Sequence, residues 1–333
     1  MVVTQSQTNL HTVTISNDQI CATILNFGAR LIDLRLAGHA NSLVLNLAKL
    51  SDHLNDMSHM GAIAGPVANR IAGAKASLND KSYHFEPNEN AQQTLHGGHY
   101  GTGRQFWQLT KISETMLHAS LAQDDGALGF PGKRNLSAIY RLEGNKLHLF
   151  LSCTTDAPSW CNLAPHAYFN LDGSTDIRHH YLQITARNYL PVNKNNIPTG
   201  IIAPVAGTNF DFQNQRSLTD FVTGKSTAID HNYCLKLPTQ PDPKIQTVAT
   251  LVSEASSIKM ELSTDQPGLQ LYFSQFLEDG TAGSDGRTYG PFSGICLEPQ
   301  GWPDAPNQTS FPPVEILPQT PYLSHSCFAF TKT

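Results

Sequence analysis

Apolar residues recur at every second position along much of this chain, in short runs separated by turn-forming residues. Near the N-terminus the runs are Val13 and Ile15, then Ile20, Ala22 and Ile24, then Ile32, Leu34 and Leu36, then Leu43, Leu45 and Leu47. Side chains that repeat with a period of two share one face of a β-strand, whereas a helix needs a period near 3.6. The alternation therefore restricts the chain to a β-rich fold in which each strand has one apolar face.

The pattern predicts where the strands lie. We expect four short strands of a meander within residues 10–47, followed by a hairpin that turns at Asn79-Asp80. Further strands are expected at 116–121, 137–142, 147–153, 181–190, 201–212, 229–235, 247–252, 258–262, 268–276 and 326–330. One short helix capped by Ser51 is predicted within residues 50–60. The proline-rich segment before the last strand is expected to cover a sheet edge.

Composition supports the same fold class. Only 15% of the 333 residues are charged, whereas glycine (24) and proline (20) are frequent, so turns are common and charged helix faces are scarce. A chain of this length can bury a core without disulfides or metals, and no linker-like or repeated stretch divides it. We therefore expect an all-β fold, a large single-domain β-sandwich over residues 1–333 with few short helices.

Charge and hydropathy exclude several classes of partner. The net charge is -5 and no basic run occurs, so neither nucleic acid nor an anionic membrane is an expected partner. No apolar run approaches eighteen residues, and the N-terminus lacks the regions of a signal peptide, so we expect a cytoplasmic protein. The six cysteines contain no C-x-x-C pair, which in that compartment predicts reduced, mostly buried thiols.

One carboxylate near the C-terminus is a candidate catalytic group. The strand-forming run Ile295-Cys296-Leu297 leads to Glu298, and Pro299 and Gly301 follow it, so we expect the strand to end at Glu298. Beside Trp302 this carboxylate would be partly desolvated, which raises its pKa and makes it a better base. The alternative is a solvated charge at a sheet edge.

A second polar group lies on a predicted strand within residues 162–173. His166, Tyr168 and Asn170 share one face of that strand, and the opposite face is apolar. A histidine, a phenol and an amide are unusual on an outer face, where Lys, Glu or Thr would serve solubility better. The face is therefore a candidate binding surface, and a solvated outer face or a core histidine is the alternative.

A glycine-rich loop, Leu95-His96-Gly97-Gly98-His99, is the third candidate. It lacks the lysine and the hydroxyl of a phosphate loop, so nucleotide binding is disfavoured. Two histidines in a loop do not make a ligand set, so no metal is expected. Its glycines would let a sugar-sized ligand approach the backbone while His96 donates or accepts a hydrogen bond.

Together these stretches resemble the aldose 1-epimerase (galactose mutarotase) family. The resemblance rests on six stretches in family order: Asn69-Arg70-Ile71, Leu95-His96-Gly97-Gly98, His166-Ala167-Tyr168-Phe169-Asn170-Leu171, Asp230-His231-Asn232-Tyr233, Pro267-Gly268-Leu269-Gln270-Leu271-Tyr272, and Leu297-Glu298 with Pro303-Asp304-Ala305-Pro306-Asn307. It implies a β-sandwich with a sugar site on a concave sheet face and reversible interconversion of the α and β anomers of a free aldose such as galactose or glucose. The Thr-Asn that often precedes the family's catalytic histidine is Ala164-Pro165 here.

By position the resemblance implies a role for each candidate. Glu298 corresponds to the general base and His166 to the general acid. The implied sugar-binding groups are Asn69, Arg70, His96, Asp230 and Gln270, and Tyr168 joins them as a neighbour of His166 on the same strand face. The reaction changes no oxidation state and forms no covalent intermediate, so no cofactor and no metal are expected. The expected partner is a monosaccharide, and the expected assembly is a monomer or a weak homodimer.

Three other functions remain open at this level. A glycoside hydrolase could use Glu298 and Asp230 as paired carboxylates. A non-catalytic carbohydrate-binding protein could carry the same surface. A phosphosugar mutarotase should have a cationic cluster for the phosphate, and only Arg70 and Arg104 are available near the motifs.

Overall fold

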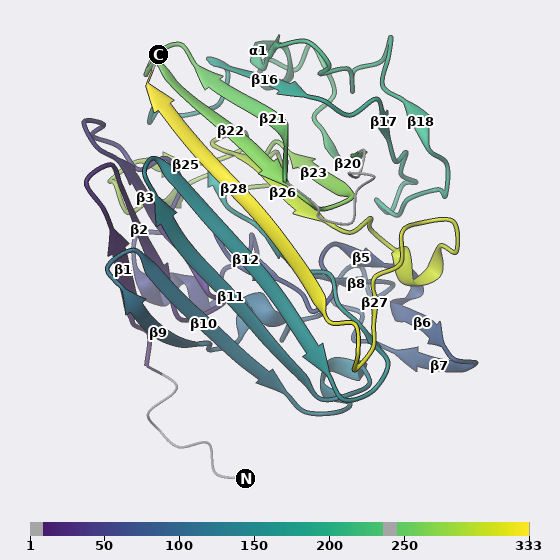
Figure 1. Cartoon of the computed structure of the whole chain (residues 1–333). Helices are drawn as coiled ribbons and strands as arrows, with labels where there is room; N and C mark the ends of the chain where they lie inside the picture. The colour runs from purple at the N-terminus through teal and green to yellow at the C-terminus, as the bar shows by residue number, and fades with distance from the viewer. Residues whose placement is uncertain (1–8, 236–244, 333) are drawn as a thin grey trace.

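A nine-stranded antiparallel sheet is the largest element, and it crosses the front of Figure 1 with its last strand in yellow. The computed structural model describes residues 9–235 and 245–332; residues 1–8, where no targeting signal is expected, lie outside them. The sheet order is β19 (Arg216–Ser217), β16 (His180–Ile184), β21 (Gln246–Ser253), β22 (Ile258–Thr264), β28 (Tyr322–Lys332), β12 (Lys146–Thr155), β11 (Arg134–Glu143), β10 (Met116–Gln123) and β9 (Gln108–Ser113).

Two further sheets pack against its inner face. The six-stranded sheet has the order β15 (Tyr168–Phe169), β26 (Ile295–Gln300), β23 (Gly268–Tyr272), β20 (Asp230–Cys234), β17 (Asn188–Tyr189) and β18 (Ala203–Pro204). The three-stranded sheet consists of β1 (Thr12–Ser16), β2 (Ile20–Leu25) and β3 (Arg30–Leu36). This arrangement is the predicted all-β sandwich.

Short elements complete the described residues. Five two-stranded ladders pair β4 (Ile63–Ala64) with β14 (Ala164–Pro165), β5 (Arg70–Ile71) with β8 (Thr94–Leu95), β6 (Lys75–Leu78) with β7 (Lys81–His84), β13 (Ser159–Trp160) with β27 (Glu315–Ile316), and β24 (Thr281–Ala282) with β25 (Thr288–Tyr289). The helical segments are η1 (Leu50–Leu54), η2 (Ala72–Ala74), η3 (Thr102–Arg104), η4 (Ala127–Gly129), α1 (Thr219–Val222) and η5 (Ala305–Asn307). Helices are few and short, as expected.

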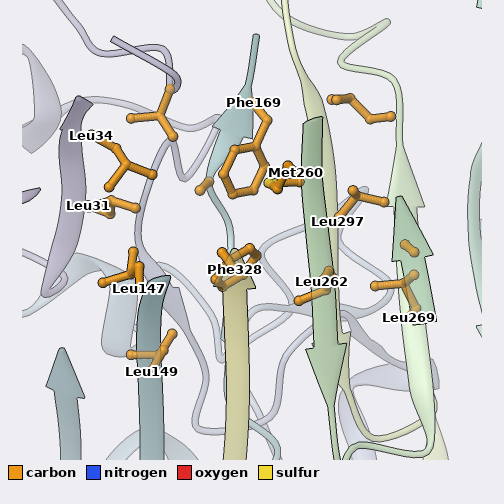
Figure 2. Close-up of a cluster of buried hydrophobic side chains, with 14 of the residues drawn as sticks. Leu31, Leu34, Leu147, Leu149, Phe169, Met260, Leu262, Leu269, Leu297 and Phe328 are labelled. Carbon is orange, nitrogen blue, oxygen red and sulfur yellow. The ribbon is translucent and has the colours of Figure 1, made fainter. Parts of the chain in front are cut away.

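The main core fills the space between the sheets. Figure 2 shows side chains from all three of them: Leu147 and Leu149 on β12, Phe328 on β28, Met260 and Leu262 on β22, Leu269 on β23, Leu297 on β26, Phe169 on β15, and Leu31 and Leu34 on β3. All are almost completely buried. Because the inward side chains are every second residue of each strand, the other face of the six-stranded sheet is left for polar residues.

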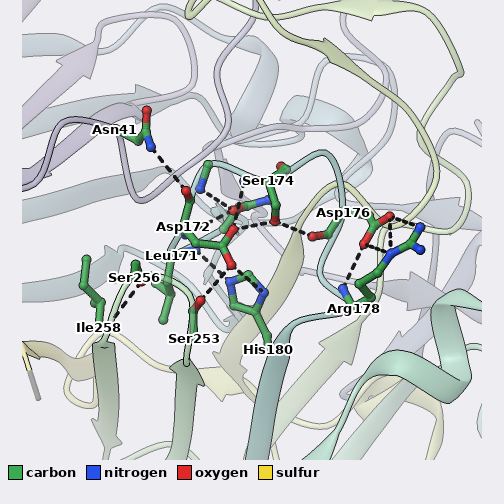
Figure 3. A network of polar contacts seen from close by, with 12 residues as sticks. Asn41, Leu171, Asp172, Ser174, Asp176, Arg178, His180, Ser253, Ser256 and Ile258 are labelled. Carbon is green, nitrogen blue, oxygen red and sulfur yellow. Dashed lines mark hydrogen bonds and ion pairs between the residues drawn. The ribbon is translucent and has the colours of Figure 1, made fainter.

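A polar network ties the segment after β15 to the nine-stranded sheet (Figure 3). The Ser253 hydroxyl on β21 donates to Asp172 Oδ2 at 2.7 Å, and the Leu171 backbone N–H donates to His180 Nε2 at 2.9 Å. Ser253 and His180 are completely buried. The network therefore fixes the position of β15 and of the residues that precede it.

Several sequence predictions were wrong in detail. Residues 43–47 alternate but form only isolated bridges, Val44 to Phe169 and Leu47 to Gly283, so the meander has three strands. The predicted helix is the single 3-10 turn η1, and its N-cap is Lys49 rather than Ser51. Strand 201–212 shrinks to β18, and the rest of that segment runs through turns and irregular backbone.

The last strand also differs from its expected place. The C-terminal strand β28 lies between β22 and β12, in the interior of the nine-stranded sheet, and the proline-rich segment before it contributes β27, which pairs with β13. The chain end therefore completes the main sheet instead of covering an edge.

Candidate active site

A cavity of about 780 Å³ opens on the polar face of the six-stranded sheet. Its lining includes all eight residues that the sequence singled out: Asn69, Arg70, His96, His166, Tyr168, Asp230, Gln270 and Glu298. These residues come from six separate stretches of the chain, which the fold brings together. The volume lies within the range of sites that enclose small molecules.

Strand alternation explains how three of these side chains reach the cavity. Leu269 and Leu297 enter the core, so their neighbours Gln270 and Glu298 lie on the opposite face. Gln270 pairs with Glu298 across β23 and β26, and Asp230 starts the adjacent strand β20. The sheet register thus places two carboxyl groups and an amide side by side.

Glu298 lies inside its strand, not at its end as predicted. Strand β26 continues through Pro299 to Gln300, and its ladder with β23 runs from Tyr272 paired with Cys296 to Gly268 paired with Gln300. The carboxyl group is 2% exposed, and its Oε2 atom has no hydrogen-bond partner. Glu298 is therefore a buried carboxyl group that lines the cleft and has one oxygen without a hydrogen-bond partner, and the solvated-edge alternative is wrong.

His166 lies directly opposite this carboxyl group. The distance from His166 Nε2 to Glu298 Oε1 is 3.7 Å, and both side chains are buried. Burial raises the pKa of Glu298 well above its ordinary value, with the nearby Asp230 adding to the rise and Arg70 opposing it. Burial lowers the pKa of His166 to about 4. Burial therefore pushes each group toward its neutral form, and the pair holds one exchangeable proton.

The backbone and neighbours of His166 hold its ring in place. Its backbone N–H donates to the Ala62 carbonyl at 2.9 Å, and its ring stacks on Tyr168 with centroids 5.3 Å apart. The Tyr168 hydroxyl donates to the Ser58 carbonyl at 2.8 Å. Tyr168 thus lines the cleft mainly as a support under the imidazole, and its hydroxyl is already bonded within the protein.

Asp230, Gln270 and Arg70 form a connected polar wall. Gln270 Nε2 donates to Asp230 Oδ1 at 2.6 Å, and Arg70 Nη1 lies 3.8 Å from Asp230 Oδ2. Arg70 also donates to Glu89 from Nε at 2.7 Å and from Nη2 at 2.9 Å. Gln270 Oε1 is buried without a partner. Since its side chain is nine-tenths or more buried, this oxygen is an acceptor that a ligand hydroxyl could satisfy.

Asn69 and His96 flank the end of the β5–β8 ladder where Arg70 pairs with Leu95, and both line the cavity. The Asn69 backbone N–H donates to His96 Nδ1 at 3.2 Å, so the proton of a neutral His96 ring is on Nε2. Both residues have left-handed backbones, with φ of 60° at Asn69 and 51° at His96. Non-glycine residues adopt this conformation at some energetic cost, and both of these residues line the cavity.

One residue of the predicted polar face does not reach the cleft. Asn170 is completely buried, and its Nδ2 donates to the carbonyls of Ser174 at 3.0 Å and Ser293 at 2.9 Å. Its role is to fix the turn after β15.

The sequence also missed cleft residues. Glu89, His59, Asp56, Tyr272 and Phe276 line the cavity. Glu89 and His59 lie in irregular segments where no strand period predicts a facing direction. Tyr272 could have been identified, because it is two residues after Gln270 on β23 and side chains two residues apart share one face of a strand.

A metal ion could be held at one point in the cleft. Ligand atoms of His166, Cys296 and Glu298 lie within 4.8 Å of one another, and Cys296 Sγ is 3.6 Å from His166 Nδ1. A thiolate, an imidazole and a carboxylate are ligands that zinc accepts. Burial raises the pKa of the Cys296 thiol, however, which disfavours the thiolate that a metal needs.

Comparison with known proteins assigns the family. A family model described as aldose 1-epimerase matches residues 11–327. The chain belongs to the aldose 1-epimerase family. It is 35% identical over 324 residues to galactose mutarotase of Rattus norvegicus, covering 95% of this chain and 93% of the rat protein. It is 32% identical over 307 residues to aldose 1-epimerase of Escherichia coli strain K12, covering 89% and 87%. The protein is therefore an isomerase of the aldose 1-epimerase type.

Solved structures give the same fold for this aldose 1-epimerase. An aldose epimerase homologue from C. elegans superposes with a TM-score of 0.90 at 28% identity, covering 98% of this chain and 100% of that one. The galactose 1-epimerase of Lactobacillus acidophilus has a TM-score of 0.85 at 24% identity, covering 98% and 96%. Across residues 9–235 and 245–332, none of the helices has the length and apolar character needed to cross a bilayer.

Proposed function

We propose that the cleft interconverts the α and β anomers of a free aldose, with Glu298 as the general base and His166 as the general acid. The observation that carries the proposal is the 3.7 Å separation of His166 Nε2 and Glu298 Oε1 in a cavity that also holds hydrogen-bonding groups for sugar hydroxyls. A base and an acid this close can act on two oxygens attached to the same carbon. The C1 hydroxyl and the ring oxygen of a pyranose are such a pair.

The reaction needs two proton transfers and no other chemistry. The base removes the proton of the C1 hydroxyl while the acid delivers a proton to the ring oxygen, the bond from C1 to the ring oxygen breaks, and an aldehyde forms. Rotation about the C1–C2 bond turns the other aldehyde face toward the hydroxyl, and the reverse transfers close the ring. Atoms and electrons balance without an oxidant, a reductant or a leaving group.

The environment of Glu298 suggests how the sugar sets the protonation state. Burial opposes the charged form of Glu298, so the proton of the pair favours the carboxyl group. Glu298 Oε2 lacks a donor, and a bound C1 hydroxyl would supply one. A hydrogen bond to the charged form lowers the pKa of a carboxyl group, so sugar binding favours the carboxylate beside a protonated imidazole. That state is the one required for ring opening.

The other polar groups would hold the distal hydroxyls and leave C1 free to rotate. Asp230 and Gln270 offer acceptors, and Arg70, Asn69 and His96 offer donors. A sugar hydroxyl both donates and accepts, so a cavity that offers both kinds of group suits it. Tyr168 supports the imidazole from below.

Polarimetry tests the proposal directly. Freshly dissolved α-anomers of galactose, glucose, arabinose and xylose should lose optical rotation toward equilibrium faster with the protein present, and the ratio of rates gives the preferred aldose. A glycosidase using Glu298 and Asp230 would instead release reducing sugar from a glycoside, and a binding module would leave the rate of rotation unchanged. No acceleration with any of the four aldoses would refute the proposal.

Location and assembly form the finer part of the proposal. All six cysteines are free thiols, and at least four of them are buried, which suits a reducing compartment such as the cytoplasm. Because the site is built within one chain, a monomer or a weak homodimer would be sufficient for activity. Cell fractionation and sedimentation at several concentrations test these two statements.

A further inference from the structure

A third imidazole lies in the cleft beside those of His96 and His166. His59 lines the cavity and is 4% exposed. Its ring centroid is 4.7 Å from that of His96 and 6.2 Å from that of His166. No sequence motif pointed to it, and the acid–base mechanism does not use it. Buried polar atoms usually have hydrogen-bond partners, so the partner of each of its two ring nitrogens has to be identified.

The segment that carries His59 is pinned at several points. Its carbonyl accepts from the Ala62 backbone N–H at 2.9 Å. On the N-terminal side, Asp56 Oδ2 accepts from the Met60 backbone N–H at 3.0 Å and from Arg30 Nη1 at 2.7 Å. His59 itself has a left-handed backbone with φ of 55°. The surrounding bonds therefore hold a strained residue, as occurs at ligand sites, and they fix where its ring points.

The two ring nitrogens have different surroundings. Nδ1 is buried without a hydrogen-bond partner and faces the backbone at Gly103, where an added Cβ would lie 3.4 Å from it. Burial lowers the pKa of His59 to about 3, so the ring is neutral near pH 7 and carries one proton. Orphaned buried donors are rarer than orphaned acceptors, which leaves the bare lone pair on Nδ1. The proton is then on Nε2, the nitrogen that remains for the cleft.

We infer that His59 donates a hydrogen bond from Nε2 to a hydroxyl oxygen of the bound aldose and so helps to select which aldose binds. This inference rests on the proposed function and adds a specificity residue to it. His96 has the same tautomer, so two imidazole donors stand side by side in a cavity that also holds the acceptors Asp230 and Gln270. The ligand that fits is a neutral polyol rather than an acidic sugar, since Asp52, Asp56, Glu89 and Glu278 also line the cavity.

A packing role for His59 makes a different prediction. If the ring only supported His96, removing the ring would weaken the binding of every sugar to the same degree, whatever hydroxyls that sugar carries. If Nε2 donates to one hydroxyl, the substitution should not weaken the binding of a sugar that lacks that hydroxyl. The coupling between a side chain and one substrate group therefore separates the two roles.

The test uses His59→Phe, which keeps a flat ring and removes the donor. The unmutated protein and the variant are compared by polarimetry on galactose and on its 2-, 3-, 4- and 6-deoxy forms. For galactose the variant should show KM raised about three- to tenfold, as for one neutral hydrogen bond, with kcat within about twofold. For one of the deoxy sugars the two proteins should have the same KM.

Controls make each outcome decisive. His118→Asn, which changes a histidine that contacts Ser137 on the nine-stranded sheet, should leave all KM values unchanged. If the phenylalanine variant does not fold, His59→Leu serves the same comparison. An equal rise in KM for every sugar, or no rise for galactose, overturns the inference while leaving the proposed function intact. Failure of the proposed function looks different, because the unmutated protein itself would then accelerate no anomerisation.

Discussion

Replacing Glu298 by glutamine is expected to lower activity and raise stability in the same molecule. The amide has nearly the shape of the carboxyl group, so the buried site beside His166 and Gln270 is kept. Glutamine cannot take a proton from the C1 hydroxyl. A positioned acid–base group contributes about 10² to 10⁴ in rate, so the rate should fall at least about a hundredfold, or about 2.7 kcal/mol of barrier.

The gain in stability follows from the pKa of the same group. Burial raises the pKa of Glu298 above its ordinary value of 4.5 in the folded protein. Above about pH 4.5 the unfolded chain releases this proton while the folded chain keeps it. The free energy of unfolding therefore falls by about 1.4 kcal/mol per pH unit, up to the folded-state pKa. Glutamine does not titrate, so the variant should match the unmutated protein near pH 4.5 and exceed its stability at pH 7.5.

Two measurements check the expected fall in rate and the expected rise in stability. Polarimetry on freshly dissolved α-galactose gives the rate, and urea unfolding at pH 4.5 and 7.5 gives the difference in free energy. Glu143→Gln is a matched control, because that glutamate lies at the end of β11 with its side chain 66% exposed. It should change neither quantity appreciably. A Glu298→Gln variant with near-normal turnover, or with lower stability than the unmutated protein at pH 7.5, would refute the reasoning.

Three further predictions concern other parts of the molecule. His166→Asn should lower kcat at least about a hundredfold with an unchanged circular dichroism spectrum, since it removes the acid; near-normal polarimetric rates would contradict this. The value of kcat/KM should fall as pH drops through about 4, the pKa of His166, because a second proton then occupies the pair; a flat profile to pH 3.5 would oppose it. Arg30→Met should cost about 3–5 kcal/mol in urea unfolding, because the buried Asp56 loses its partner at 2.7 Å; a cost below about 1 kcal/mol would show that the pair is dispensable.

The sequence predicts a strand correctly where that strand pairs with a neighbouring strand along its whole length. Residues 43–47 alternate like the others, but they meet Phe169 and Gly283 only at single bridges, and alternation does not reveal how many partners a strand finds. Pro299 misled the prediction for a related reason. Strand β15 pairs only with Ile295 and Cys296, so beyond Cys296 that side of β26 has no ladder partner in the sheet. A proline costs little there, and the strand continues.

The candidate site could be predicted only in part. Period two places Glu298 and Gln270 away from the core, but the sequence alone does not state that β23 and β26 are neighbours. The six family stretches supplied that proximity, and all eight residues line one cavity. His59 and Glu89 escaped because they lie in irregular segments, where the direction of a side chain depends on tertiary contacts such as the Arg30–Asp56 pair.

The burial of this acid–base pair follows from how the sandwich is covered. The six-stranded sheet uses one face for the core, and its other face would ordinarily be wet. Here the His59 segment and the loops around Asn69 and His96 cover that second face, so Glu298 and His166 are 2% and 6% exposed. The same desolvation raises the pKa of Glu298, lowers the pKa of His166 and destabilises the charged carboxylate. Desolvation causes both the pKa shifts and the loss of stability, so a substitution that removes the titrating carboxyl group must trade activity for stability. Exposing the cleft to solvent would reduce the pKa shifts and the loss of stability together.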